Sequence, residues 1–397
     1  MDCVDYTPFR RKSEWENAKI SYDLKKNLHK FPGTILFRAL SGWKPSLLTI
    51  VKQLPKRPAC AKLGPMKKRK GGILMEGNTL TVRGLRTQFH TAKGILPAAD
   101  GIDITVPRGK IVGLVGESGC GKSVTALSVM GLVRAPGEIA AGEILLGDRD
   151  LRTLSPKELQ KLRGDRMAMI FQDPMTSLNP VYTVGRQVSE SLRLHKNMNK
   201  AQAKEKTIDL FRQVGIPDPE GRFDAYPREL SGGLRQRVMI AMAMACQPEL
   251  LIADEPTTAL DVTIQAQILS LMEKLSREHG TSILLITHNM GVVAQLCDYV
   301  YVMYAGQVVE QAETFELFRN PRHPYTLGLL KAIPSLDGEE DRLYNIRGSV
   351  PDLADLPKGC RFCPRCDCAR EDCGTDTPAL VEISPDHWVR CINDETT

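Results

Sequence analysis

The sequence lacks the features that would insert the chain into a bilayer or direct it to secretion. None of its apolar runs approaches the ~18–20 residues that span a bilayer, and the best candidate, residues 33–51, is interrupted by Arg38, Lys44 and Pro45. The N-terminal residues show no clean apolar core before a small-residue cleavage site, which excludes a typical secretory signal. We therefore expect a cytosolic protein whose 11 cysteines are mostly reduced thiols or metal ligands.

Acidic residues are scarce in the first 72 residues. This segment holds 17 Lys and Arg against 5 Asp and Glu, in a chain whose net charge is +6. Such a basic segment binds anionic lipid or nucleic acid in some proteins and is a flexible, solvated extension in others. The second interpretation is favoured here. A third is that the protein starts at Met66 or Met75, since nothing after residue 73 depends on the extension.

Residues 116–123, Gly-Glu-Ser-Gly-Cys-Gly-Lys-Ser, match the phosphate-binding pattern G-x-x-x-x-G-K-[ST]. They follow an apolar run that predicts a buried strand and open a helical pattern, which is the context that such a loop requires. Glycines let the backbone approach a triphosphate, and backbone N–H groups at the helix N-terminus attract its charge. The loop therefore predicts binding of ATP or GTP. The candidate binding residues are Gly116, Glu117, Ser118, Gly119, Cys120, Gly121, Lys122 and Ser123.

Charged side chains of this loop and of a later strand are suited to nucleotide chemistry. Lys122 is expected to reach the β- and γ-phosphates, and Ser123 to hold Mg²⁺. Asp254 and Glu255 end an apolar strand that begins at Leu250. Asp254 is the expected second Mg²⁺ ligand, and Glu255 is placed to polarise an attacking water. A carboxylate beside another carboxylate and a metal titrates differently from its neighbour, so that one can serve as base.

Residues 230–237, Leu-Ser-Gly-Gly-Leu-Arg-Gln-Arg, predict a second anion-binding helix end. Ser231 is a suitable N-cap, and Gly232 and Gly233 leave backbone N–H groups accessible. One ATP cannot easily use both this end and the phosphate loop, because a helical insert lies between them. The physical solution is a two-fold dimer in which each nucleotide is bound by the loop of one chain and Ser231–Gly233 of the other.

With these motifs together, the chain resembles the ABC-type ATPases over residues 75 to about 325. The resemblance implies that Gln172 links the γ-phosphate to a transmembrane partner and adds to the Mg²⁺ site. It implies that Asp261, in the motif Ala-Leu-Asp, faces the second subunit. It also implies that His288 contacts the γ-phosphate and acts with Glu255 in catalysis. Leu234 stands where Gln is common, which changes a side chain and leaves the glycine N–H donors in place.

The same resemblance gives the expected architecture. We expect an α/β fold in which a P-loop core carries an antiparallel β-subdomain, with strands at 80–85 and 101–106, and a helical subdomain at about residues 155–237. A parallel sheet is predicted where strand, helix and strand alternate between residues 250 and 287. Phe89, 27 positions before Gly116, either stacks on the adenine or packs in the core.

The C-terminal residues look like the tail of the oligopeptide, dipeptide and nickel import ATPases. The similarity lies in three segments, 320–326, 329–334 and 359–366. It divides the chain into a basic extension (1–72), an ABC ATPase domain (73–325) and a Cys-rich extension (326–397).

The implied function is hydrolysis of ATP to energise uptake of oligopeptides or dipeptides. The implied partners are a homologous second ATPase, two permease subunits and, indirectly, a substrate-binding protein, at the cytoplasmic face of the membrane. A nickel or other small-solute importer is the alternative. A soluble ABC ATPase that acts on nucleic acid or ribosomes fits less well, because the chain has one phosphate loop, one signature and no sustained heptads, so no nucleic acid is expected.

Six of the cysteines fall after residue 359. The family pattern corresponds to Cys360, Cys366, Cys373 and Cys391, where some members are thought to hold an iron–sulfur cluster. This chain departs from that pattern, because Cys363 stands where histidine is usual and a further cysteine, Cys368, is present. Four thiolates suit either a [4Fe–4S] cluster or tetrahedral zinc, and unmetallated thiols packed in a small fold remain a third interpretation.

Overall fold

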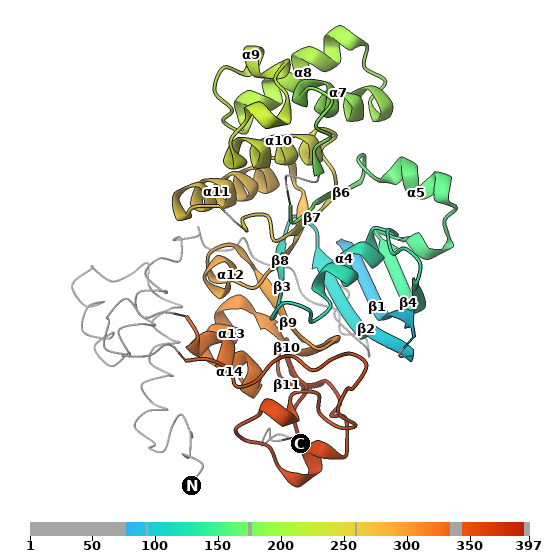
Figure 1. Cartoon of the computed structure of the whole chain (residues 1–397), viewed down its shortest axis with the longest axis vertical. Helices are drawn as coiled ribbons and strands as arrows, with labels where there is room; N and C mark the ends of the chain where they lie inside the picture. The colour runs from blue at the N-terminus through green and yellow to red at the C-terminus, as the bar shows by residue number, and fades with distance from the viewer. Residues whose placement is uncertain (1–76, 93, 174–176, 259, 334–343, 393–397) are drawn as a thin grey trace, which may run out of the picture. The chain divides into compact units, whose positions relative to one another are not determined.

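The computed structural model describes residues 77–392, with gaps at residues 93, 174–176, 259 and 334–343 (Figure 1). The basic extension, the apolar run at 33–51 and Ala259 lie outside the described residues. The described residues all belong to one of the two compact units into which the chain divides, made of residues 58–333 and 343–397. In this described part, no helix combines the length and apolar character needed to cross a bilayer.

The smaller of two sheets is antiparallel, as the sequence predicted. Its strands, in the spatial order β2-β1-β4-β5, are β1 (Asn78–Thr91), β2 (Gly94–Pro107), β4 (Gly137–Leu146) and β5 (Arg149–Asp150). The first two strands are longer than the predicted segments at 80–85 and 101–106, because they pair as a hairpin over their whole length, from Asn78 opposite Pro107 to Thr91 opposite Gly94.

The larger sheet has a parallel centre. Its spatial order is β11-β12-β10-β9-β3-β8-β7-β6. Its strands are β3 (Ile111–Val115), β6 (Met167–Ile170), β7 (Leu250–Asp254), β8 (Ser282–Thr287), β9 (Tyr299–Tyr304), β10 (Gln307–Glu313), β11 (Val381–Ser384) and β12 (His387–Val389). The neighbours β9-β3-β8-β7-β6 are all parallel, which confirms the predicted parallel sheet, and β10, β11 and β12 extend it with antiparallel pairs.

The described residues also form α-helices. They are α4 (Lys122–Val129), α5 (Pro156–Leu162), α7 (Val184–His195), α8 (Lys200–Gln213), α9 (Pro219–Phe223), α10 (Gly232–Met244), α11 (Val262–His279), α12 (Met290–Leu296), α13 (Thr314–Arg319) and α14 (Pro324–Lys331). Ser155 and Asn199 form capping boxes at the starts of α5 and α8, where the hydroxyl or amide side chain satisfies an orphan N–H. Gly280, with φ of 68°, ends α11 because a residue without Cβ adopts that conformation without strain.

Both faces of the parallel sheet are covered, and the alternation of side chains along each strand separates two cores. Ile111 and Leu251 belong to the core shared with the helices α7, α8, α10 and α11, whereas their neighbours Val112 and Leu250 belong to the core shared with the small sheet and α4. Strands β3, β7 and β8 are buried at every position. This fits parallel strands covered on both sides. Figure 1 shows α4 next to the small sheet and α7 to α10 grouped beyond β6 and β7.

The C-terminal segment, residues 344–392, joins the large sheet through β12, which pairs with β10. A buried carboxylate anchors this junction. Glu310 of β10 is fully buried and accepts hydrogen bonds from His387 Nε2 at 2.8 Å, from the backbone N–H of Arg322 at 2.8 Å and from that of His323 at 2.9 Å. Donors on two other segments therefore satisfy a charge that would otherwise be costly to bury.

Burial of His323 makes the stability of this junction dependent on pH. Its Nδ1 accepts a hydrogen bond from the Tyr325 backbone N–H at 3.1 Å. Burial, reinforced by the charge of Arg390, lowers the pKa of His323 from 6.5 to about 3. Between these two values the unfolded chain binds a proton that the folded chain does not. The free energy of unfolding therefore falls as the pH falls below about 6.5.

We expect the burial of His323 to lower the free energy of unfolding by about 2 kcal/mol when the pH falls from roughly 8 to 5. The variant His323→Gln should lose this part of the pH dependence, because glutamine keeps an acceptor for the Tyr325 N–H and does not titrate. Chemical denaturation of both proteins at the two pH values measures the difference. The same dependence on pH in both proteins would contradict the assignment.

Candidate functional site

The candidate site lies at one edge of the large sheet, where four neighbouring parallel strands end. Strand β3 runs into residues 116–123, β8 into His288, β7 into Asp254 and Glu255, and β6 toward Gln172. The pairing β3-β8-β7-β6 brings these carboxyl ends side by side. Residues from distant parts of the chain, between positions 116 and 288, are thus gathered at one edge, which is where ligands bind in sheets of this type.

The backbone of the phosphate-loop segment adopts conformations that require glycine. Gly116, Gly119 and Gly121 have φ of 152°, 81° and 104°. A Cβ on Gly121 would lie 2.1 Å from the carbonyl oxygen of Ala98, and one on Gly116 would lie 2.1 Å from that of Met303. The glycines in this sequence pattern are therefore a steric requirement of the loop. The loop conformation leads directly into α4, so the backbone N–H groups of Cys120 to Ser123 lie at its N-terminus.

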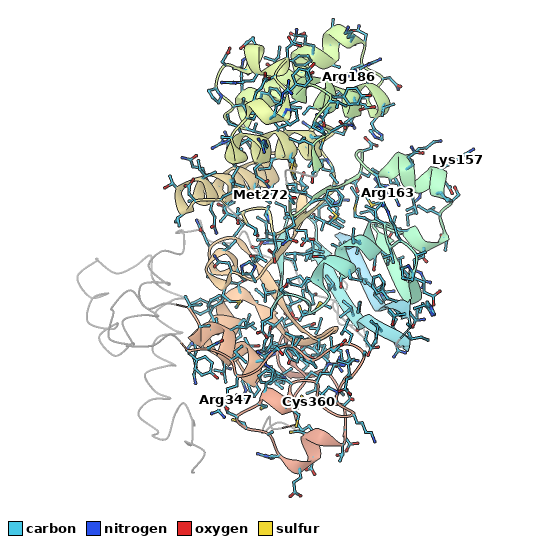
Figure 2. The ribbon with its side chains drawn as sticks, viewed as in Figure 1. Lys157, Arg163, Arg186, Met272, Arg347 and Cys360 are labelled. Carbon is cyan, nitrogen blue, oxygen red and sulfur yellow. The ribbon has the colours of Figure 1, made fainter. Side chains whose placement is uncertain are left out.

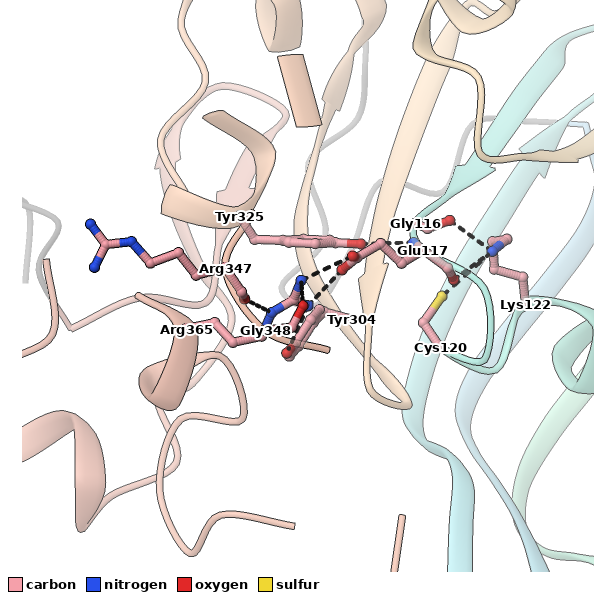
Figure 3. Close-up of polar contacts among 9 residues, drawn as sticks. All are labelled: Gly116, Glu117, Cys120, Lys122, Tyr304, Tyr325, Arg347, Gly348 and Arg365. Carbon is pink, nitrogen blue, oxygen red and sulfur yellow. Dashed lines mark hydrogen bonds and ion pairs between the residues drawn. The ribbon is translucent and has the colours of Figure 1, made fainter. Parts of the chain in front are cut away.

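Lys122 is buried in this loop with a defined position. Its Nζ donates to the carbonyl oxygens of Gly116 at 2.8 Å and Glu117 at 2.9 Å, and its side chain is largely enclosed. The ammonium group therefore lies across the loop and adds positive charge to it (Figure 3). Cys120 Sγ is 3.7 Å from the same Nζ, and burial, the largest effect, raises the pKa of the Cys120 thiol. The thiol is therefore neutral at physiological pH.

Asp254, at the end of β7, has an environment that suits a metal ligand. It is buried, and no described residue is hydrogen-bonded to its Oδ1. Burial raises the pKa of Asp254, and a hydrogen bond from the Ser123 side chain opposes this effect. A buried carboxylate oxygen without a partner is costly unless a cation or water compensates it. Ser123 and Asp254 therefore fit a Mg²⁺ ion bound together with a phosphate.

Glu255 receives hydrogen bonds from three side chains. Gln172 Nε2 donates to its Oε2 at 3.1 Å, Thr258 Oγ1 donates to the same oxygen at 2.9 Å, and His288 Nδ1 lies 3.1 Å from Oε1. The structure thus brings together Gln172, Glu255 and His288, which the sequence proposed as a set, and adds Thr258. The backbone of Glu255 has φ of 47°, a conformation that non-glycine residues adopt rarely and often at functional sites.

The charge state of Glu255 follows from these partners. Burial alone raises the pKa of Glu255, but the hydrogen bonds from His288 and Thr258 outweigh it, so that the net shift is downward. Its neighbour Asp254 shifts in the opposite direction, upward, mainly through burial. The two carboxylates therefore have different affinities for a proton, as the sequence predicted, and Glu255 is ionised at physiological pH.

The second anion-binding helix end belongs to a different part of the fold. Ser231 caps α10 by accepting from the Leu234 N–H at 3.4 Å, and both Ser231 and Gly232 are exposed. Helix α10 packs against α7, α8, α11 and β6, whereas α4 packs against β1, β2 and β7. Asp261 caps α11 by accepting from the Ile264 N–H at 2.9 Å. Its role toward a second subunit stays a prediction.

Phe89 lies on β1 opposite Gly137 of β4. The ring is partly exposed and packs closely on that glycine, since a Cβ on Gly137 would lie 2.6 Å from Phe89 Cε1. This contact shows that the ring packs against β4. Stacking of the ring on an adenine stays a prediction.

The structure also places residues next to the phosphate loop that the sequence did not point to. The side chain of Glu117 is paired with Arg365, and the backbone N–H of Glu117 donates to the Tyr325 hydroxyl at 2.8 Å (Figure 3). Tyr325 lies in the segment 320–326, and Arg365 stands between Cys363 and Cys366. Nothing in the sequence signalled that these residues, more than 200 positions from the loop, contact it.

The cysteines of the C-terminal segment do not support the iron–sulfur prediction. Cys360 (Figure 2), Cys363, Cys366, Cys373 and Cys391 line one small pocket with His323 and Phe362. Among the described residues, however, no group of three or more His, Cys, Asp or Glu side chains is arranged to hold a metal ion.

Burial also affects the titration of three of these thiols. Burial is the main effect on Cys360, Cys363 and Cys366 and raises the pKa of each thiol, to about 12 for Cys366. These three thiols are therefore protonated in this structure. The ligand set Cys360, Cys366, Cys373 and Cys391 is not supported as a cluster or zinc site in this structure.

Comparisons with known proteins agree with the fold. The sequence model of the family described as "ABC transporter" matches residues 99–258, and that described as "Oligopeptide/dipeptide transporter, C-terminal region" matches residues 309–373. "Oligopeptide transport ATP-binding protein AppD" of Bacillus subtilis (strain 168) is 53% identical over 313 residues, which cover 79% of this chain and 95% of that protein. "Dipeptide transport ATP-binding protein DppD" of Escherichia coli (strain K12) is 48% identical over 312 residues, with 79% and 95% covered.

Solved structures place the fold in the same group. The post-hydrolysis dimer of the ATP-binding cassette MJ0796, bound to ADP and Pi, superposes with a TM-score of 0.54 at 25% identity and covers 59% of this chain and 98% of that one. The cbiO1 protein of Clostridium perfringens, part of the ABC transporter complex cbiONQ, has a TM-score of 0.53 at 27% identity, with 62% and 92% covered. From its motifs, its site and its similarity to these proteins, the chain belongs to the ATP-binding proteins of the oligopeptide and dipeptide ABC transporters.

Proposed function

We propose that this chain hydrolyses ATP to energise the uptake of oligopeptides or dipeptides through a membrane importer. The observation that carries the proposal is the meeting of Glu255, His288 and Gln172 at the sheet edge where the phosphate loop also begins. The printed names of the most similar relatives describe oligopeptide and dipeptide transport and peptide import. Peptide is the proposed solute on that ground.

Binding of the triphosphate is assigned to the loop at 116–123. Its backbone N–H groups and the N-terminus of α4 surround the phosphates, and Lys122 supplies a positive charge to their β and γ positions. Ser123 and Asp254 are the residues that would hold Mg²⁺, with Gln172 contributing to the same site. When bound, the ion neutralises charge on the β- and γ-phosphates.

Hydrolysis is assigned to Glu255. Its ionised carboxylate accepts a proton from a water molecule while the water oxygen forms a bond to the γ-phosphorus. The bond from that phosphorus to the β-phosphate bridging oxygen breaks, and ADP and inorganic phosphate are released. His288 and Gln172 hold the Glu255 carboxylate in one orientation, and a hydrogen bond to the γ-phosphate is also assigned to His288.

The second nucleotide contact is assigned to another subunit. Ser231 and Gly232 are exposed at the start of α10, so a homologous ATPase subunit can apply its own equivalent segment to the nucleotide of this chain. Binding of ATP then closes the pair and hydrolysis releases it. The exposed apolar residues Phe171, which precedes Gln172, and Tyr182 suit contact with permease subunits. This arrangement places the chain peripherally, on the cytoplasmic face of the membrane.

The variant Glu255→Gln tests the catalytic assignment. It keeps the shape of the side chain and removes the base, so ATP hydrolysis by the assembled importer should fall by about a hundredfold to ten-thousandfold while Mg-ATP binding is retained. Phosphate release and peptide uptake into vesicles measure the effect. Glu249→Gln is the matched control, because Glu249 precedes the same strand and pairs with Arg166 at the surface. Normal turnover by Glu255→Gln would contradict the proposal.

The variant Asp254→Asn tests the metal assignment. Removing the carboxylate should weaken Mg-ATP binding by at least about tenfold, because the amide is a poorer ligand for a hard cation. Binding of ATP in the presence of a chelator should change much less, and this comparison is the internal control. Titration of each variant with ATP, with and without Mg²⁺, gives both affinities. An equal loss under the two conditions would show that Asp254 acts on the fold instead.

The variant Gly232→Asp tests the shared nucleotide site. A side chain fits there, since a Cβ on Gly232 would meet only Leu260 Cδ2, at 4.0 Å, and an acidic residue is favourable in the first turn of a helix. The new charge should repel the partner's γ-phosphate and lower the turnover of the assembled complex about a hundredfold, without loss of Mg-ATP binding by the single chain.

Gly374→Asp is the matched control for this substitution. It introduces the same side chain at a position of the C-terminal segment where a Cβ meets nothing within 4 Å. The ratio of complex turnover to single-chain affinity separates the two variants. If Gly232→Asp hydrolysed ATP as fast as Gly374→Asp, the sharing of the site between subunits would be wrong.

A further inference from the structure

The phosphate loop contains an acidic residue, whose negative charge opposes phosphate binding. Glu117 directly follows Gly116, and a carboxylate at this position repels a triphosphate. Its two oxygens, however, are bound by one guanidinium: Arg365 Nη1 is 2.7 Å from Oε2 and Arg365 Nη2 is 3.0 Å from Oε1 (Figure 3). Paired, two-point contacts of this kind are the strongest form of the Arg–carboxylate interaction.

Arg365 is itself held by its surroundings. Its side chain is 5% exposed. Its Nε donates to the Arg347 carbonyl oxygen at 2.6 Å, its Nη2 to the Gly348 carbonyl oxygen at 3.3 Å and its Nη1 to the Tyr304 hydroxyl at 3.4 Å. The hydrogen bonds to Glu117 are the main effect that raises the pKa of Arg365. The guanidinium is thus a fixed, permanent charge, and it determines where the Glu117 carboxylate lies.

The backbone of the same loop residue is held from the same side. The Glu117 N–H donates to the Tyr325 hydroxyl at 2.8 Å. The Tyr325 ring packs against those of Tyr304 and Phe362, at centroid distances of 4.7 Å and 5.4 Å. Tyr325 lies on α14, and Phe362 and Arg365 belong to the C-terminal segment. One end of the phosphate loop is therefore supported, in side chain and backbone, by residues near the C-terminus.

A second contact links this segment to the loop through the turn between β9 and β10. Arg361 Nη1 donates to the Ala305 carbonyl oxygen at 2.6 Å, and the adjacent Gly306 N–H donates to the Cys120 carbonyl oxygen at 2.9 Å. Arg361 is also paired with Asp100. Two arginines four positions apart thus reach the loop at Glu117 and, through the turn, at Cys120.

We propose that Arg365 is a positioning residue for the nucleotide site, which neutralises the Glu117 carboxylate and holds it away from the bound triphosphate. The proposal deepens the proposed function and rests on it, since it assumes that residues 116–123 bind ATP. It extends the nucleotide-binding unit to a segment that lies beyond the part of the chain matched by the ABC transporter family.

The expected consequence of losing Arg365 is electrostatic. An uncompensated Glu117 carboxylate would repel the phosphates directly. It would also attract Lys122, whose Nζ already lies 2.9 Å from the Glu117 carbonyl oxygen, and so withdraw that charge from the nucleotide. Both effects weaken ATP binding. Neither touches Glu255 or its hydrogen-bond partners, so the chemical step should be spared.

The experiment measures Mg-ATP affinity of the full chain and the kinetics of the assembled importer for four proteins. Arg365→Met keeps the length of the aliphatic stem and should bind Mg-ATP about tenfold more weakly than wild type, with a raised KM for ATP and little change in kcat. Glu117→Gln combined with Arg365→Met removes the charge that Arg365 opposes and should restore most of the lost affinity.

Arg347→Met is the matched control. Arg347 belongs to the same segment (Figure 2), but its side chain points away from the loop (Figure 3) and pairs with Asp367 at the surface, where it is 83% exposed. Only its backbone carbonyl contacts Arg365, and that group survives the substitution. Its Mg-ATP affinity should equal that of wild type.

The outcomes separate this inference from the proposed function. If wild type bound no Mg-ATP, the proposed function would fail. If wild type bound it and Arg365→Met bound it equally well, the proposed function would stand and the inference would fail. A double variant that stayed as weak as Arg365→Met, or that did not fold, would also overturn the inference, because Arg365 would then act independently of Glu117. If Arg365→Met alone did not fold, a folded double variant with near-normal affinity would support it.

Discussion

The parallel alignment of β6, β7, β8 and β3 is the constraint on which the rest of the molecule depends. Side-by-side pairing in one direction forces the carboxyl ends of the four strands to one edge of the sheet. The loop after β3, the two acids after β7, the histidine after β8 and the glutamine after β6 meet there for that reason alone. Packing on both faces fixes the position of each strand. It therefore also fixes the positions of the polar residues at the strand ends.

The environment at this edge gives two adjacent carboxylates opposite pKa shifts and different roles. Asp254 is enclosed, with an oxygen to which no described residue hydrogen-bonds, and its pKa is raised. Glu255 accepts hydrogen bonds from Thr258, Gln172 and His288, and its pKa is lowered. One side chain is thereby suited to a cation and the other to holding a water molecule. The two side chains differ in this way although they are neighbours in the sequence.

The C-terminal segment takes part in this site more directly than its composition indicated. The sequence emphasised its cysteines, yet the described residues offer no metal-binding arrangement. Its arginines carry the contacts instead. Arg365 meets Glu117 and Arg361 meets the turn that binds Cys120. Support of the phosphate loop is thus a function of residues near the opposite end of the chain.

The sequence alone determined the local features of this protein. The glycines of residues 116–123 and the apolar strands before Asp254 and His288 depend on neighbours within a few positions, so spacing was enough to predict them. The length of β1 and β2, the three partners of Glu255 and the pairing of Arg365 with Glu117 were decided only by the tertiary structure. They depend on which distant segments pack together, and on how burial there changes the energy of a charge, neither of which residue spacing encodes.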